Sequence, residues 1–289
     1  MGELESDWNE ILDTPISEAT KTRDVKIKLR TSKDNYAAKV ATMLAHIERG
    51  DIYEANFCQE FYAEETTIHP LSVFEALNSI SRPPFATFLK LDAHYVLSAS
   101  PERYLKKTAE TIISQPIKGT AKRLSDPKAD AAIVTKLEND PKERSENIMI
   151  TDLVRNDLSR IAQKGSVAVE ELCKIYTFDQ VHQMISTIRC KAAAAFSPVQ
   201  IIKNTYPMGS MTGAPKVSAM KIMEQLEETK RGIYSGAIGY FTPNNDFDFN
   251  VVIRSILYNS SKNNDKFLLT KIVFHSFHLS NIVESGPLI

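Results

Sequence analysis

The clearest repeating pattern begins near Asp34, where apolar side chains recur at intervals of three and four residues. They are Tyr36, Val40, Met43, Leu44 and Ile47. This spacing places them on one face of an α-helix, and Gly50 stands where a glycine commonly caps a helix C-terminus. We therefore predict an amphipathic helix that ends at Gly50.

Stretches rich in β-branched and aromatic residues then predict strands at 52–62, 85–91 and 94–99. A short turn separates the last two, which indicates an antiparallel hairpin. From residue 126 to residue 165 the pattern is helical, with a break at Pro141. Asp140 can cap the second helix of this region, and Glu143 can close a capping box.

The loop at 209–213 precedes another predicted helix, with Pro215 near its start and Gly232 at its end. Its expected apolar face is made by Val217, Met220, Met223 and Leu226. Two strands, 234–241 and 247–258, follow around a turn at 243–246. We predict that these strands form a second hairpin.

Strands grouped in hairpins, with helices between them, predict an α+β protein in which antiparallel sheets pack in layers and helices lie outside them. The first residues are polar and weakly patterned. We therefore expect an N-terminal arm at 1–24 and a single domain at 25–289.

The composition excludes several classes of protein. The 289 residues include 35 basic and 36 acidic side chains, so no electrostatic signature for nucleic acid or for an anionic membrane is present.

No apolar run is long enough to span a bilayer, and the N-terminus is acidic where a signal peptide is basic. The three cysteines, Cys58, Cys173 and Cys190, are widely spaced and predict neither a disulfide framework nor a zinc site. We expect a cytoplasmic protein.

Glu143 and Glu146 are three residues apart, so on a helix they share one face. That face continues through Ile150, Leu153 and Val154, which places the two carboxylates at the border of the core. A pair of this kind suits a magnesium ion that keeps several waters. The alternative is that Glu143 only caps the helix and Glu146 is solvated.

Arg254 lies in a predicted strand whose opposite face is mostly apolar. A guanidinium in this position needs an anion, and its planar fork suits a carboxylate. The alternative is an internal ion pair with Asp248. Lys118 follows an apolar residue in Pro116-Ile117-Lys118-Gly119-Thr120, and taken alone it is best interpreted as a solvated surface charge.

Four separated stretches together resemble the chorismate-utilising enzymes, the family of anthranilate synthase component I, aminodeoxychorismate synthase component I and the isochorismate and salicylate synthases. The stretches are 116–120, 143–157, 209–216, and 236–240 with Arg254. The resemblance runs from about Asp51 to about Tyr258. It implies the family's layered fold, chorismate as substrate and Mg²⁺ as cofactor.

The resemblance also implies roles for individual residues. Glu143 and Glu146 would help to hold magnesium, and Arg254 with Tyr234 would bind the enolpyruvyl carboxylate. The remaining substrate-binding positions are Gly119, Thr120, Ser210, Gly213, Gly236 and Gly239. His182 matches a histidine of the catalytic site, although Gln183 follows it where many relatives carry a second histidine, and a structural role for His182 is equally open.

Lys118 distinguishes branches of the family, because anthranilate synthases resemble this stretch but carry a small residue here, whereas aminodeoxychorismate synthases carry lysine. The resemblance therefore implies a lysine that attacks ring carbon 2 as the carbon 4 hydroxyl leaves. Ammonia from a glutamine amidotransferase subunit then displaces the lysine. Such an amine must be partly deprotonated, which burial or a nearby cation favours.

After about Lys266 the chain diverges from the family, which continues with a strand and an acidic Asp-Ser-x-Pro-x-x-Glu-x-x-Glu helix. Glu284 has no partner at helical spacing, so we expect a metal site with only half of its carboxylates. Two alternatives to the aminodeoxychorismate branch stay open. One is an enzyme that makes anthranilate or isochorismate, and the other is a protein that binds chorismate or a glutaminase without catalysis.

Overall fold

The computed structural model describes residues 25–64, 66–262 and 277–278. The arm expected at 1–24 lies outside the described residues, and so does the divergent C-terminal segment with Glu284, apart from residues 277–278. Within the described chain, antiparallel sheets and surrounding helices confirm the predicted α+β class.

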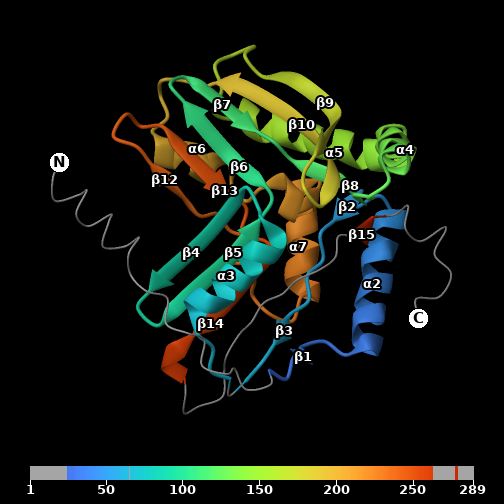
Figure 1. Cartoon of the computed structure of the whole chain (residues 1–289). Helices are drawn as coiled ribbons and strands as arrows, with labels where there is room; N and C mark the ends of the chain where they lie inside the picture. Colours follow the sequence, from blue (N-terminus) through green and yellow to red (C-terminus); the bar gives the residue numbers. More distant parts are fainter. Residues whose placement is uncertain (1–24, 65, 263–276, 279–289) are drawn as a thin grey trace.

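The larger sheet has seven strands and occupies the upper half of the molecule in Figure 1. In spatial order they are β12 (Gly239–Phe241), β13 (Phe247–Asn250), β6 (Arg103–Thr108), β7 (Thr111–Ser114), β10 (Val181–Lys191) and β8 (Ile117–Lys122), with β9 (Ala168–Thr177) paired to β10. All of these pairings are antiparallel. The pattern of the sequence did not predict the long β9–β10 hairpin.

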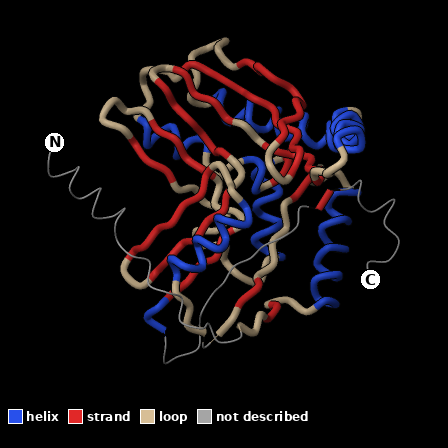
Figure 2. The backbone as a smooth tube through the Cα atoms, in the orientation of Figure 1, coloured by secondary structure: helices blue, strands red, loops and turns tan. Residues whose placement is uncertain are grey.

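A second sheet contains β14 (Ser255–Asn259), β5 (His94–Ser100) and β4 (Phe85–Leu91). The β4–β5 pairing confirms the hairpin predicted at 85–99. Helix α3 (Pro70–Ser81), which the sequence pattern did not predict, packs against this sheet. Figure 2 shows these strands as a set apart from the larger sheet, in the lower part of the view.

The strand predicted at 52–62 is wrong in extent. Only β2 (Glu54–Ala55) and β3 (Phe61–Tyr62) are strands, and they belong to different sheets. β2 pairs with β11 (Gly213–Ala214) and β15 (Phe277–His278), while β3 pairs with β1 (Lys28–Leu29). Residues 54–58 are all buried, so the segment lacks the half-exposed alternation of an ordinary strand.

The helices largely follow the predicted pattern. Helix α2 (Lys33–Glu48) matches its prediction, and the break at Pro141 separates α4 (Pro127–Glu138) from α5 (Pro141–Ser159). Helix α5 packs against β8, β9 and β10, and its buried apolar residues join the main core. The remaining helical segments are α6 (Pro198–Thr205), α7 (Lys216–Leu226) and the 3₁₀ turns at Gly209–Met211 and Ser260–Lys262.

The predicted apolar face of α7 is correct for Met223 and Leu226, which pack in the core, and wrong for its first two residues. Val217 and Met220 are exposed, whereas Ala219, Ile222 and Met223 are buried against α2 and the β2 segment. The charged Lys216 at the start of the helix is also buried. Because this lysine points inward, the buried stripe is rotated from the one that apolar residues alone indicate.

The second predicted hairpin is correct only near its turn. β12 pairs with β13 through residues 239–241 and 247–249, and the chain then leaves the larger sheet and enters the smaller one as β14. The Asn250 side chain fixes this departure, because it accepts from the Ile238 N–H and donates to the Phe85 carbonyl. Arg254 consequently lies between two strands, at φ +50°, and not in the middle of one.

Candidate active site

A cavity of about 380 Å³ lies where β8, the first turns of α5, the 209–211 turn and the connections between the two main sheets meet. Most of the residues predicted to form a site line it. They are Lys118, Gly119, Thr120, Glu143, Glu146, Ser210 and Arg254. The cavity is lined by both cations and carboxylates, since Lys142 and Glu102 also face it.

Lys118 is buried, with 8% of its surface exposed, so its interpretation as a solvated surface charge is wrong. It lies in β8, next to Gly119 at φ +91°, a conformation that favours glycine. The Lys118 ammonium nitrogen is 2.9 Å from a carboxylate oxygen of Glu54, which is also buried. A buried amine at the wall of a cavity is the environment that a lysine nucleophile requires.

Helix α5 presents its two carboxylates to the same cavity. Asp140 caps the helix by accepting from the backbone N–H groups of Lys142 and Glu143. One Glu143 oxygen lies against Gly119, only 3.1 Å from the position that a Cβ there would occupy. Glu146 is buried, so its interpretation as a solvated residue is wrong.

Asn147 fixes the helix relative to β8. Its side-chain NH₂ donates to the carbonyl oxygens of Lys118 and Met184, at 3.3 and 3.1 Å. Because Asn147 is 1% exposed and next in sequence to Glu146, it sets the rotation that turns both carboxylates toward the cavity. The sequence shows an asparagine at this position but does not indicate either of these two carbonyl partners.

Two connections between the main sheets run side by side at the cavity. The first links β5 to β6 and carries Glu102, and the second links β13 to β14 and carries Arg254. The Val251 N–H donates to the Glu102 carbonyl, and the Ala99 N–H donates to the Arg254 carbonyl. Asp248 pairs with Arg103 instead of Arg254, so the predicted alternative of an Arg254–Asp248 ion pair is wrong.

Glu102 is a site residue that the sequence interpretation missed. Burial raises its pKa to about 7, and the Ser210 hydroxyl, Lys118 and Arg254 lower it only in part. A carboxyl with this pKa can donate a proton near neutral pH. The available signal was Ser100-Pro101-Glu102, a charged residue that directly follows an apolar strand.

We expect Glu102→Gln to stabilise the protein in a pH-dependent way. Because the folded-state pKa lies above the unfolded value, ionised Glu102 opposes folding increasingly as the pH rises from 4.5 to about 7. The variant should equal the wild type near the lower pH and be more stable by up to about 3 kcal/mol near pH 8. Thermal unfolding measured across this range tests the expectation.

The control is Glu171→Gln, since hydrogen bonds from Lys174 and Tyr176 lower the pKa of Glu171. Its carboxylate stabilises the folded state above the ordinary carboxyl pKa, and this contribution is lost as the pH falls. The control variant should therefore be the less stable protein at neutral pH. A Glu102→Gln effect that did not change with pH would contradict the assigned protonation.

His182 does not line the cavity, although its neighbour in sequence, Gln183, does. Its Nε2 contacts Asp130 at 2.9 Å and its Nδ1 contacts Thr177 at 2.9 Å, within a side chain that is 1% exposed. The Leu124 N–H and His182 together lower the pKa of Asp130 to about 2. The structure therefore places His182 in a buried contact between α4 and β10, and it is Gln183 that reaches the cavity.

Tyr234, Gly213, Gly236 and Gly239 also lie outside the residues that line the cavity. Tyr234 is buried in a turn, and burial raises its pKa. Gly239 allows β12 to approach β13, since a Cβ there would lie 2.2 Å from the Asp248 carbonyl oxygen. The structure thus brings together the charged residues of the prediction and separates three of its glycines from them.

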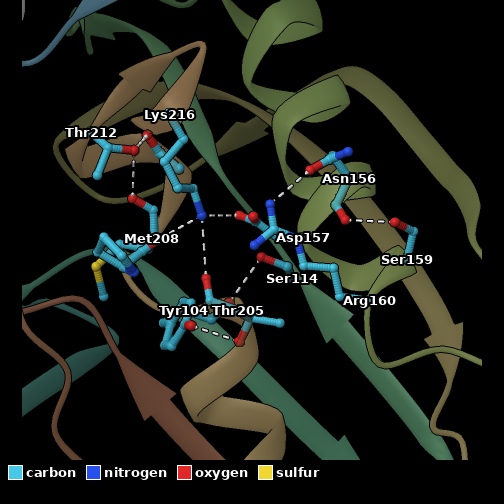
Figure 3. Close-up of polar contacts among 12 residues, drawn as sticks. Tyr104, Ser114, Asn156, Asp157, Ser159, Arg160, Thr205, Met208, Thr212 and Lys216 are labelled. Atoms are coloured by element: carbon cyan, nitrogen blue, oxygen red, sulfur yellow. Dashed lines mark hydrogen bonds and ion pairs between the residues drawn. The ribbon is translucent and has the colours of Figure 1, made fainter. Parts of the chain in front are cut away.

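The turn that carries Ser210 is held from behind by a buried ion pair (Figure 3). Lys216 of α7 contacts an Asp157 oxygen of α5 at 2.5 Å and donates to the carbonyls of Thr205 and Pro207. Asn56 holds the front of the turn by donating to the Ser210 carbonyl at 2.9 Å. Ser210 is therefore fixed between α5, α7 and the β2 segment.

Glu143 and Glu146 fit part of a magnesium site. They lie on one face of α5 and line an open cavity, where a hard cation can be bound by carboxylate oxygens and water. Within the described ranges, no cluster of three or more His, Cys, Asp or Glu side chains is placed to hold a metal ion. No helix in the described part of the chain is long and apolar enough to cross a membrane.

Comparison with known proteins identifies the family. The model of the chorismate binding enzyme family matches residues 3–269. The chain belongs to this family. Aminodeoxychorismate synthase component 1 of Klebsiella aerogenes is 39% identical to this chain over 249 residues, and that of Escherichia coli K12 is 37% identical to it over 243 residues. The aligned regions cover 86% and 84% of this chain but 55% and 53% of those proteins.

Solved structures agree with this assignment. Anthranilate synthase component I from Streptococcus pneumoniae superposes with a TM-score of 0.77 at 28% identity, covering 89% of this chain and 58% of the other. The menaquinone-specific isochorismate synthase of Escherichia coli gives a TM-score of 0.75 at 15% identity, covering 96% and 63%, and this similarity concerns the fold alone. The chain thus spans about half the length of the curated chorismate-binding enzymes that it matches.

Proposed function

We propose that this chain is the chorismate-binding part of an aminodeoxychorismate synthase component I, which converts chorismate and ammonia to 4-amino-4-deoxychorismate for para-aminobenzoate and folate synthesis. The observation that carries the proposal is Lys118, a buried amine at the wall of a cavity that also holds an acid and an arginine. The relatives named above support it. We place the reaction in the cytoplasm, with ammonia supplied by a glutamine amidotransferase subunit.

Chorismate carries two carboxylates, and the cavity offers two ways to bind them. Arg254 presents a guanidinium fork from the connection between β13 and β14, and Glu143 and Glu146 present carboxylates from α5. When bound by these two residues, Mg²⁺ would neutralise their charge and provide a cation for the ring carboxylate. The Ser210 turn also lines this cavity.

The reaction uses Lys118 and Glu102 in complementary roles. The Lys118 amine forms a bond to ring carbon 2, the ring double bond shifts, and the carbon 4–oxygen bond breaks. Glu102 donates its proton to the departing hydroxyl, which leaves as water, and this fits a pKa near 7. Ammonia then attacks carbon 4, and the bond from carbon 2 to Lys118 breaks as the double bond returns.

The test is to incubate the chain with chorismate, MgCl₂ and an ammonium salt and to identify products by liquid chromatography with mass spectrometry. We expect 4-amino-4-deoxychorismate and a dependence on magnesium. Anthranilate or isochorismate as the product would assign the chain to another branch of its family. Chorismate binding without any product would favour the non-catalytic alternative.

We expect Arg254→Lys to weaken chorismate binding by roughly 1–3 kcal/mol, because an ammonium cannot reproduce a two-pronged contact with a carboxylate. Titration calorimetry measures the effect. The matched control is Arg103→Lys, whose arginine pairs with Asp248 and Gln115 within the sheet. The control should lose thermal stability but keep its affinity, and the opposite pattern would contradict the role of Arg254.

A further inference from the structure

The Lys118 amine has a buried carboxylate partner that is not among the residues lining the cavity. Glu54 is 2% exposed and is absent from the residues that line the cavity, whereas Lys118 lines it. The 2.9 Å contact therefore joins the reacting nitrogen to a group that substrate does not reach. Neither the composition nor the spacing of the sequence points to this partner.

The backbone fixes Glu54 firmly. It lies opposite Ala214 in the β2–β11 pairing, and the Tyr53 N–H donates to the Ala214 carbonyl on one side. On the other side the Asn56 N–H donates to the Thr212 carbonyl. Gly213 makes this close approach possible, since a Cβ there would lie 2.2 Å from the Glu54 carbonyl oxygen.

Other charged side chains line the cavity that Lys118 faces. The described ones at the cavity come from α5 and from the connections between the sheets, and they are Lys142, Glu143, Glu146, Glu102 and Arg254. Glu102 is reserved for the leaving hydroxyl, and the α5 carboxylates face the predicted metal position. Glu54 is thus the carboxylate that the described structure places in an ion pair with Lys118.

We propose that Glu54 positions Lys118 and accepts its proton before the amine attacks. This inference rests on the proposed function. One proton moves from the Lys118 nitrogen to the Glu54 oxygen, which turns an ion pair into a neutral amine and a neutral acid. Burial favours that exchange, because both charges disappear from a site shielded from water. The freed electron pair then forms the bond to ring carbon 2.

The proposal predicts a particular pH dependence. The proton stays within the pair, so forming the free amine in the wild type needs no net release of a proton to solvent. Turnover should therefore be nearly level between about pH 5 and pH 6, where a pKa of about 7 leaves Glu102 largely protonated. Without Glu54 the proton must go to water, and the rate should fall about tenfold for each unit of decreasing pH.

The experiment compares kcat and KM of the full chain with those of Glu54→Gln, Glu54→Asp and Glu60→Gln. In Glu54→Gln we expect kcat at about pH 6 to be at least about tenfold lower, with KM for chorismate within about twofold of the wild type. Glu54→Asp keeps a base and should keep the level profile at a reduced rate. Glu60→Gln removes another buried carboxylate of the same segment, one that pairs with Arg30, and should leave the profile unchanged.

A second measurement does not require turnover. Reductive methylation of Lys118, followed by peptide mass spectrometry over a pH series, should proceed at a nearly level rate in the wild type and should slow about tenfold for each unit of decreasing pH in Glu54→Gln. The same pH dependence of methylation in both proteins, or a level rate profile in Glu54→Gln, would overturn the proposal. If the wild-type chain makes no 4-amino-4-deoxychorismate, the proposed function fails, while the methylation rates still decide whether Glu54 controls Lys118.

Discussion

Lys118→Ala should reduce formation of 4-amino-4-deoxychorismate by at least about 10³-fold, while chorismate affinity changes by less than about tenfold. In the proposed reaction the side chain forms a covalent bond to the ring but is not the main anchor of either substrate carboxylate. Its loss therefore affects kcat much more than binding. Ammonium salt as the nitrogen donor isolates this step from the delivery of ammonia by a partner.

Lys118→Arg is the matched control, because it keeps a cation beside Glu54 but removes the nucleophile. It should be as inactive as Lys118→Ala. Recovery of activity by arginine would mean that the charge, and not the amine, is what the reaction needs. With ammonia withheld, intact-mass analysis of the wild type should reveal a species heavier by chorismate minus water, and neither variant should form it.

Lys216→Met should destabilise the fold by about 3–5 kcal/mol, since it leaves the Asp157 carboxylate buried without its cation. Burial already raises the pKa of Asp157 and lowers that of Lys216, so each charge depends on the other. The loss should shrink as the pH falls, because a protonated Asp157 needs no cation. Thermal and urea unfolding at neutral and acid pH measure both effects.

Two further variants sharpen this result. Asp157→Asn combined with Lys216→Met should be more stable than Lys216→Met alone, because the buried charge is gone. Lys230→Met removes a lysine that pairs with Glu224 on the surface, and it should change stability by no more than about 0.5 kcal/mol. If Lys216→Met behaved like Lys230→Met, the ion pair behind the Ser210 turn would not be structural.

The sequence predicted the parts of the fold that depend on local patterns. Helix α2, the break at Pro141 and the β4–β5 hairpin each have a periodic or turn signal, and each is confirmed. The β2 segment gave a misleading strand signal, because its burial comes from α2, α7 and β11, all of which are remote in sequence. The first half of the predicted face of α7 was wrong for a similar reason, since an ion pair with α5 turns Lys216 inward.

The candidate site divides in the same way. Motif resemblance found Lys118, Arg254 and the α5 carboxylates, and the structure brings these residues to one cavity. Glu54 and Glu102 were missed because single acidic residues beside strands are common and their partners lie far along the chain. His182 shows the reverse. Its neighbour in sequence, Gln183, lines the cavity, but His182 itself contacts Asp130 instead.

The paired connections between the sheets limit how the chain can change in length. Adding or removing one residue between β5 and β6, or between β13 and β14, would turn every side chain of the following strand to the opposite face. It would also separate Glu102 from Arg254, which the two backbone hydrogen bonds between these connections hold close together. The turn at 242–246 ends a hairpin and carries no such constraint. Insertions should therefore be tolerated at that turn but not in the two connections, so homologous chains should keep both connections at the same length.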